Sequence, residues 1–197
     1  MKYSLVLIAC TAALVACNKG PEVDVKNASV GEVAEKVREA AGEGNLITPG
    51  RWETKVSVLD VDMPGMPPQF AARMKESIGK VQGGNLATCL TEADVKKPKG
   101  DFFARGAKNC RYEHFTMSGG KIDAALTCTN PGEGGAATTM KMTVVGSYSS
   151  ESYEADMTMD ASGGPRGGMK MKSHTESHRV GDCKGDEMNR HAANVGE

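Results

Sequence analysis

Alternating apolar and polar residues in the central and C-terminal parts of the chain predict a mainly β structure. From Trp52 to Val58 every second residue is suited to a buried position, which is typical of a strand with one face in a core. The phase slips at Leu59 and Val61, which indicates a β-bulge or the end of that strand. Strands are predicted over residues 51–58, 85–90, 110–117, 121–129, 138–148, 153–160 and 169–181.

Two hairpins are predicted among these strands. The turn sequence Ser118-Gly119-Gly120 joins the third and fourth predicted strands, because paired glycines suit a tight hairpin turn. The fifth and sixth strands match when Tyr148 pairs with Tyr153. In that register Met142 faces Met159, so that the apolar side chains of both strands share one face.

Three helices are also predicted. Ser29 and Glu32 have the spacing of a capping box, and the helix they begin is expected to end at Gly42 or Gly44. The second helix is predicted after the proline-rich loop 63–68 and has Phe70, Met74 and Ile78 on one face. The third is predicted over 92–97, where Thr91 caps its start and Pro98 stops it.

Together these elements indicate an α+β fold that is mainly β. Long hairpins with a single apolar face favour a strongly curved antiparallel sheet or partial barrel. We predict about seven strands with two or three short helices, and we expect the helices to cover the concave face.

The N-terminal segment predicts export and a lipid anchor. Lys2 precedes a nearly continuous apolar run from Tyr3 to Val15, which has the length of a signal-peptide core. A transmembrane helix needs about 20 apolar residues. The run closes with Leu14-Val15-Ala16-Cys17, which resembles the lipobox of bacterial lipoproteins. We expect lipidation of Cys17, and Asn18 behind it favours the outer membrane over the inner membrane.

This anchor divides the chain into four predicted parts. They are a lipoprotein signal peptide over 1–16, a polar tether over 17–28, a single globular domain over 29–183, and a flexible C-terminal tail over 184–197. Cleavage leaves 197 − 16 = 181 residues, which is the size of one ordinary domain. The net charge of −1 does not favour a nucleic acid partner. The expected location is the periplasmic side of a membrane, held by the lipid anchor.

Four cysteines remain when the signal peptide and Cys17 are set aside. An even number in an oxidising compartment predicts two disulfides. The favoured pairing is sequential, Cys89–Cys110 and Cys128–Cys183. It would constrain both weakly held ends of the domain, where the entropy of the open chain is largest. The alternative pairing joins Cys110 to Cys128 across the hairpin and leaves Cys89 to reach Cys183.

Several short segments spread over residues 48–183 together resemble a known family. They are Pro49–Glu53, Met63–Pro67, Cys89–Val95 followed by Lys97-Pro98, Cys110–Tyr112, Ser118–Ile122, Leu126–Cys128, Gly146–Tyr148 and Cys183. In this combination the chain is similar to the bacterial domain-of-unknown-function family 3617, small exported proteins with paired cysteines. The resemblance implies an exported location and disulfides, and it carries no activity or catalytic residue to this chain.

Paired methionines are the main candidate chemistry. They are Met140 with Met142, Met157 with Met159, and Met169 with Met171. Residues two apart on a strand share a face, and thioethers are soft ligands suited to Cu(I). Methionines that fill an irregular β core give the same alternation, and we favour this interpretation over a metal site.

Histidines offer weaker candidates. His174, Glu176 and His178 share one face of the last predicted strand, but at about 3.3 Å per residue the two histidines stand about 13 Å apart. A single ion therefore cannot bind both, and a solvated face is expected. His114 has no partner that the sequence identifies. We expect no metal and no other cofactor.

The sequence lacks the GxSxG and HExxH motifs and a phosphate-binding glycine loop. We therefore expect a non-enzymatic envelope module without catalytic residues, which binds an apolar ligand or an envelope protein on its curved sheet. The alternative hypothesis is a Cu(I)-binding envelope protein that uses the paired methionines.

Overall fold

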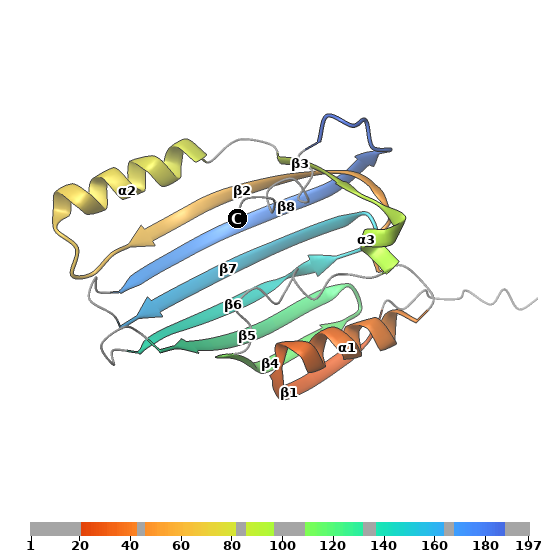
Figure 1. Ribbon diagram of the computed structural model, residues 1–197, viewed down its shortest axis with the longest axis horizontal. Coiled ribbons are helices and arrows are strands. Elements are labelled where there is room, and N and C mark those ends of the chain that lie inside the picture. Colours follow the sequence, from red (N-terminus) through yellow and green to blue (C-terminus); the bar gives the residue numbers. More distant parts are fainter. Residues whose placement is uncertain are drawn as a thin grey trace, which may run out of the picture.

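Eight antiparallel strands form one curved, unclosed sheet in the order β1-β4-β5-β6-β7-β8-β2-β3 (Figure 1). The computed structural model describes residues 21–42, 46–81, 86–96, 109–131, 137–163 and 168–187. The elements in chain order are β1 Val23–Ser29, α1 Val30–Ala41, β2 Gly50–Asp62, α2 Pro68–Val81, β3 Leu86–Leu90, α3 Glu92–Lys96, β4 Cys110–Ser118, β5 Lys121–Asn130, β6 Thr138–Tyr148, β7 Ser152–Ser162 and β8 Met169–Gly181. The predicted mainly β fold with a curved antiparallel sheet is confirmed.

Strand β1 is the element that the sequence patterns missed. The predicted polar tether over 17–28 is wrong from Val23 onwards, because this segment pairs along β4 at one edge of the sheet. Val23 and Ala28 are both buried, but Asn27 between them has a positive φ of 51° and no register partner. This irregularity breaks the period of two, and the charged residues on the other face make the segment look like a solvated spacer.

Both predicted hairpins are confirmed. Gly119 and Gly120 form the turn between β4 and β5 with φ angles of 57° and 74°, the left-handed values that a two-residue hairpin turn needs. Tyr148 pairs with Tyr153 at the other turn. The predicted β-bulge in β2 is also present, because the register with β8 shifts between Val58 and Asp60.

The helices lie at the margins of the sheet. The capping box of α1 is confirmed, with Glu32 N–H donating to the Ser29 hydroxyl and Ser29 N–H donating to the Glu32 carboxylate, and α1 ends at Gly42. This helix packs on β1 and β4. Helix α2 instead runs beside the part of β2 that β3 leaves unpaired (Figure 1). Of these two helices, α1 packs on two strands at one side of the sheet and α2 contacts β2.

The best-packed core lies between α1 and the β1–β4–β5 side of the sheet. Val30 and Val33 of α1 join Tyr112 and Phe115 of β4 there, and the two rings meet edge to face with centroids 5.4 Å apart. The apolar face of the sheet continues from this core across β6, β7 and β8.

The sequential disulfide pairing is wrong, and the alternative is present. Cys110 and Cys128 are register partners on β4 and β5 and are disulfide-bonded with Cα atoms 4.0 Å apart. Cys89 is bonded to Cys183 with Cα atoms 5.4 Å apart. Strand order explains the result: six spacings of about 4.8 Å separate β4 from β3, so about 29 Å would lie between Cys89 and Cys110.

The segment after β8 is part of the fold as far as Glu187. The predicted flexible tail over 184–197 is therefore wrong for its first four residues, because Glu187 is buried and bonded to residues of that segment. The remaining tail, the signal peptide and Cys17 lie outside the described residues. Within the described ranges, no helix is both long and apolar enough to cross a membrane.

Candidate functional site: the methionine face and the Arg51 clasp

The paired methionines come together on the apolar face of three adjacent strands. Met142 of β6 is the register partner of Met159 of β7, which in turn pairs with Met171 of β8. We call these three residues the methionine row. Directly opposite residues on one face of a sheet have Cβ atoms about 4.5–5.5 Å apart, so the three side chains are immediate neighbours.

The rows on either side extend this surface. One contains Val144, Met157 and Ser173, and the other contains Met140, Ala161 and Met169. We call the three rows together the methionine face. All six of its methionines are half-buried, whereas Met117 in the α1-side core is buried. The predicted common face of the methionine pairs is confirmed, and their half-burial distinguishes them from the tightly packed core.

At and beside the β8 side of this face, β8 and β2 contribute small hydroxyl side chains. Ser173 and Ser177 of β8 are buried, and the Ser177 hydroxyl lies 2.7 Å from the hydroxyl of Thr54 on β2. Trp52, buried near the start of β2, donates its indole N–H to the Thr48 carbonyl. The Thr54–Ser177 pair and the Trp52 indole therefore have hydrogen-bond partners next to the methionine face.

The opposite face of the same strands is charged. His174 lies between three carboxylates, with Nδ1 2.8 Å from Asp156 and Nε2 3.5 Å from Glu176 and 3.7 Å from Glu154. The hydrogen bond with Asp156 is the largest influence and raises the pKa of His174, with Glu176 acting in the same direction. His174 thus belongs to an ion-pair network on the face that lies across the sheet from the methionines.

The other two histidines that the sequence singled out have different surroundings. His178 is exposed and lies opposite Glu53 and Ser152 in the register, so it does not join His174. His114 has a partner after all, since its Nε2 lies 3.0 Å from Asp123 across the hairpin. No group of three or more His, Cys, Asp or Glu side chains in the described parts of the chain could hold a metal ion.

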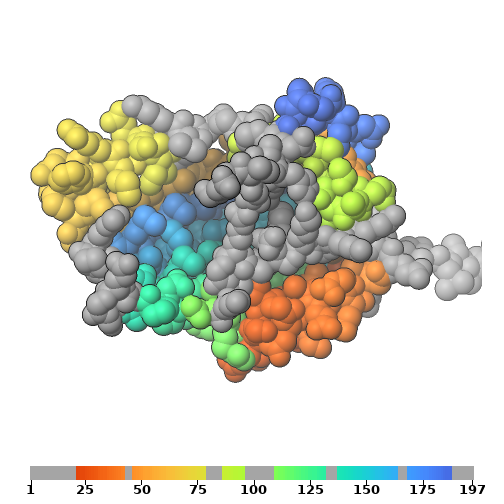
Figure 2. All heavy atoms as spheres, viewed as in Figure 1, coloured from red at the N-terminus to blue at the C-terminus, as the bar shows by residue number. Residues whose placement is uncertain are grey.

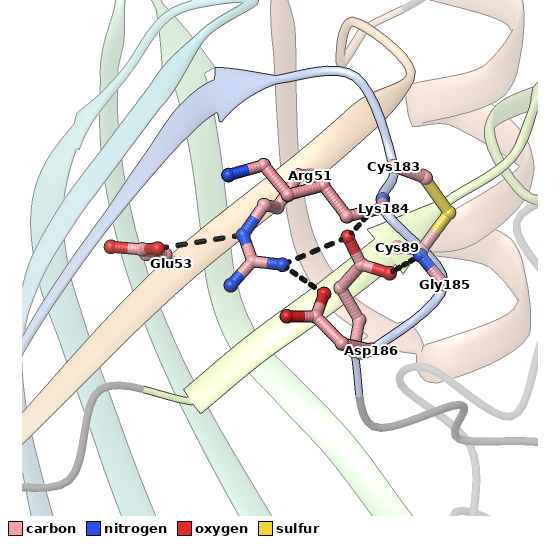
Figure 3. A network of polar contacts seen from close by, with 8 residues as sticks. Arg51, Glu53, Cys89, Cys183, Lys184, Gly185 and Asp186 are labelled. Atoms are coloured by element: carbon pink, nitrogen blue, oxygen red, sulfur yellow. Dashed lines mark hydrogen bonds and ion pairs between the residues drawn. A yellow bond between two sulfur atoms is a disulfide. The ribbon is translucent and has the colours of Figure 1, made fainter.

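A second polar site, which sequence reasoning missed, closes one end of the sheet (Figure 3). Arg51 of β2 bonds to Asp186 at 2.5 Å and to Glu187 at 3.1 Å, and its Nε lies 3.5 Å from Glu53. The Cys89–Cys183 disulfide joins β3, the neighbour of β2, to the same C-terminal segment. We call this group the Arg51 clasp.

Glu187 is the most perturbed group of the clasp. The backbone N–H of Lys184 donates to one carboxylate oxygen at 2.7 Å, and the N–H of Gly185 donates to the other at 2.8 Å. These bonds, with a contribution from Arg51, lower the pKa of Glu187 to about 2. Glu187 is bonded to Arg51 of β2 and to the backbone of Lys184 and Gly185. Together with the disulfide to Cys89, these bonds fix the C-terminal segment against β2 and β3. The only sequence signal for it is the Asp186-Glu187 pair shortly after Cys183.

The far end of the sheet carries an open hollow of about 600 Å³ beside the methionine face. Its lining includes Met169, Pro64 and the charged side chains of Lys141, Asp160 and Lys170. The Lys170 ammonium lies 3.5 Å from the Asp160 carboxylate. Lys141, Asp160 and Lys170 form one row on the charged face of the strands, so this hollow lies at the strand ends next to Met169. Figure 2 shows helices α1, α2 and α3 at the margins of this view of the molecule.

Comparison with known proteins identifies a family of unknown function. A family model described as a protein of unknown function, DUF3617, matches residues 47–183. No curated protein and no solved structure matches the chain. Strand β1 and helix α1 precede the matched range, although they complete the best-packed core. The match spans more than half of the chain, and the protein therefore belongs to the DUF3617 family.

Proposed function

We propose that this protein is a non-enzymatic lipoprotein of the cell envelope, anchored through Cys17 and exposed to the periplasm, whose methionine face binds an apolar ligand. A single observation carries the proposal: six half-buried methionines from three adjacent strands form one continuous apolar surface. Contiguous apolar surface outside a packed core marks binding sites. Methionine side chains are flexible and polarisable, so they adapt to ligands of irregular shape.

The lipid anchor is supported by the motif Leu14-Val15-Ala16-Cys17. It is also supported by the oxidising compartment in which two disulfides form. Both cysteine pairs are bonded, as is usual for exported proteins and rare in a reducing cytosol. Asn18 behind Cys17 favours the outer membrane. An envelope protein that presents an apolar segment is the second class of partner that this surface would accept.

The test is native mass spectrometry of the full-length protein extracted from its own envelope. We expect a co-purifying lipid or other apolar molecule in the wild type. The variant Met159→Gln places a polar amide in the centre of the methionine row and should weaken binding about tenfold, since burying an unpaired amide costs about 1–3 kcal/mol. Thr158→Gln, on the opposite face of the same strand, is the matched control and should retain the ligand.

Absence of any co-purifying apolar molecule or protein partner would contradict the proposal. Equal ligand loss in Met159→Gln and Thr158→Gln would also contradict it, because binding would then not depend on the methionine face.

The second candidate function is Cu(I) binding, and the methionine row is the observation that favours it. Three thioethers from adjacent strands lie side by side there, and soft sulfur ligands suit Cu(I). Replacing Met142, Met159 and Met171 by Leu separates the two functions, because leucine keeps the surface apolar and removes the sulfur. Titration with Cu(I) against a competing chelator should then show lost affinity if copper is the ligand, while unchanged affinity would eliminate this function.

A further inference from the structure

The chain enters the fold at a defined place. Val23, the first residue of β1, pairs with Met117 next to the β4–β5 turn. Just before it, the carbonyl of Pro21 accepts a hydrogen bond of 3.1 Å from the phenol of Tyr148, at the end of β6. Strand β6 is the fourth strand of the sheet, counted from the β1 edge. The N-terminal segment therefore leaves the fold at this end of the sheet, beside the start of β1 and within reach of the Tyr148 side chain.

Several turns lie at this same end of the sheet. The Tyr148 N–H donates to the Gly120 carbonyl at 2.9 Å, which joins the β4–β5 turn to the end of β6. The Arg179 N–H donates to the Glu151 carbonyl at 2.9 Å, which joins the end of β8 to the β6–β7 turn. We call the group formed by Pro21 and these two turns the tether end.

The distance from the proposed lipid anchor to the tether end is short. Cys17 and Pro21 are 21 − 17 = 4 residues apart, and four residues span at most about 14 Å even when fully extended. Strand β5 has ten residues, so its far end at Asn130 lies about 30 Å beyond the β4–β5 turn. The tether is therefore too short to let the far end of the sheet approach the lipid anchor as closely as the tether end does.

We propose that the tether end faces the lipid bilayer and that the opposite end, with Asn130 and Thr138, faces the periplasm. This inference rests on the lipid anchor of the proposed function and adds the orientation of the domain. The strands then run outward from the membrane. Met142 lies six residues from Tyr148 along β6, so the methionine row stands about 20 Å above the tether end. An apolar ligand must therefore leave the anchoring bilayer to reach it.

The experiment uses the full-length acylated protein in phosphatidylethanolamine–phosphatidylglycerol vesicles, with a photo-crosslinking benzoyl-phenylalanine in place of one residue at a time. Glu151, exposed in the β6–β7 turn, reports on the tether end. Asn130, exposed at the end of β5, is the matched position at the far end. After illumination, lipid adducts are counted by mass spectrometry.

We expect lipid adducts at Glu151 several-fold above those at Asn130. A third protein carries the Glu151 label and 20 inserted Gly/Ser residues between Lys19 and Gly20, which adds an average reach of about 25 Å. Its adducts should fall several-fold, because the short tether is what holds this end at the membrane.

Each alternative result overturns the orientation or the claim that the short tether sets it. Equal adducts at the two positions, or background adducts at both in protein that remains on vesicles, would show that the tether does not orient the domain. Undiminished adducts after the insertion would show that the surface binds lipid by itself. Protein that floats free of vesicles despite an intact Cys17 would refute the anchor, and this outcome identifies failure of the proposed function separately.

Discussion

Arg51 and Glu187 form an ion pair of 3.1 Å although 136 positions separate them in the sequence. Arg51 also pairs in register with Cys89 of β3, whose sulfur is bonded to Cys183. A covalent bond and an ion-pair network therefore hold the same two segments, β3 and the residues after β8, against the start of β2.

Glu187→Gln is expected to lower the melting temperature at pH 7. The depressed pKa of about 2, against an ordinary value of 4.5, means that the folded state favours the charged carboxylate. Its stabilising contribution is complete above pH 4.5 and is lost as the pH falls from there through about 2. Thermal unfolding of both proteins between pH 7 and pH 2 should show a difference that shrinks with acidification. A difference that grows at low pH would contradict this assignment.

Removal of either disulfide should lower the free energy of unfolding by a measurable amount. The loop-entropy model assigns about 3 kcal/mol to the Cys110–Cys128 bond, which spans 18 positions, and about 4.7 kcal/mol to the Cys89–Cys183 bond, which spans 94. Urea unfolding of the two double-alanine variants should therefore show the larger loss for Cys89 and Cys183. Non-reducing peptide mapping checks the pairing itself, and a Cys89–Cys110 peptide would refute it.

Gly146 should be intolerant of any side chain. A Cβ added there would lie 2.1 Å from the Glu154 carbonyl oxygen and 2.8 Å from the Ala155 Cβ, so Gly146→Ala forces β6 and β7 apart. Gly31→Ala is the control, because a Cβ at this position of α1 meets no atom closer than 4.0 Å. We expect Gly31→Ala to stabilise the protein by up to about 1 kcal/mol and Gly146→Ala to destabilise it. Equal effects in denaturant unfolding would contradict the β6–β7 register.

The charged face should respond to pH through His174. Asp156 raises the pKa of His174, so protonated His174 stabilises the fold fully below its ordinary pKa of 6.5, and this contribution disappears as the pH rises through the raised value. Asp156→Asn should lower the His174 pKa, measured by NMR titration of the imidazole resonances. Asp123→Asn, beside His114, is the control and should leave the titration of His174 unchanged.

Local sequence patterns predicted the parts of this fold that depend on neighbouring residues in the chain. The Tyr148–Tyr153 register followed from matching apolar faces across a short turn, and the β2 bulge followed from the phase slip at Leu59. The helix that begins at Ser29 followed from capping chemistry within four residues. The hairpin register and the helix start depend on interactions within one hairpin or one helical turn, and the bulge is visible as a local break in alternation although its partner strand is β8.

The missed features depend on the order of strands in the sheet, which local patterns do not specify. The disulfide partner of Cys89 is set by the positions of β3 next to β2 and of β2 next to β8. The same arrangement brings Arg51 to Glu187. Strand β1 was missed for another reason, because the irregularity at Asn27 interrupts its alternation. For the methionine face, the sequence predicted which residues share a face, but their half-burial emerged only in the folded sheet.

The most direct test of the proposed ligand surface is methyl NMR of the acylated protein labelled with ¹³CH₃-methionine, titrated with a long-chain fatty acid. Saturable shifts are expected for Met142, Met159 and Met171. Met74, exposed on α2, should not shift. Unchanged resonances in the methionine row at saturating fatty acid, or shifts confined to Met74, would contradict the claim that this face binds an apolar ligand.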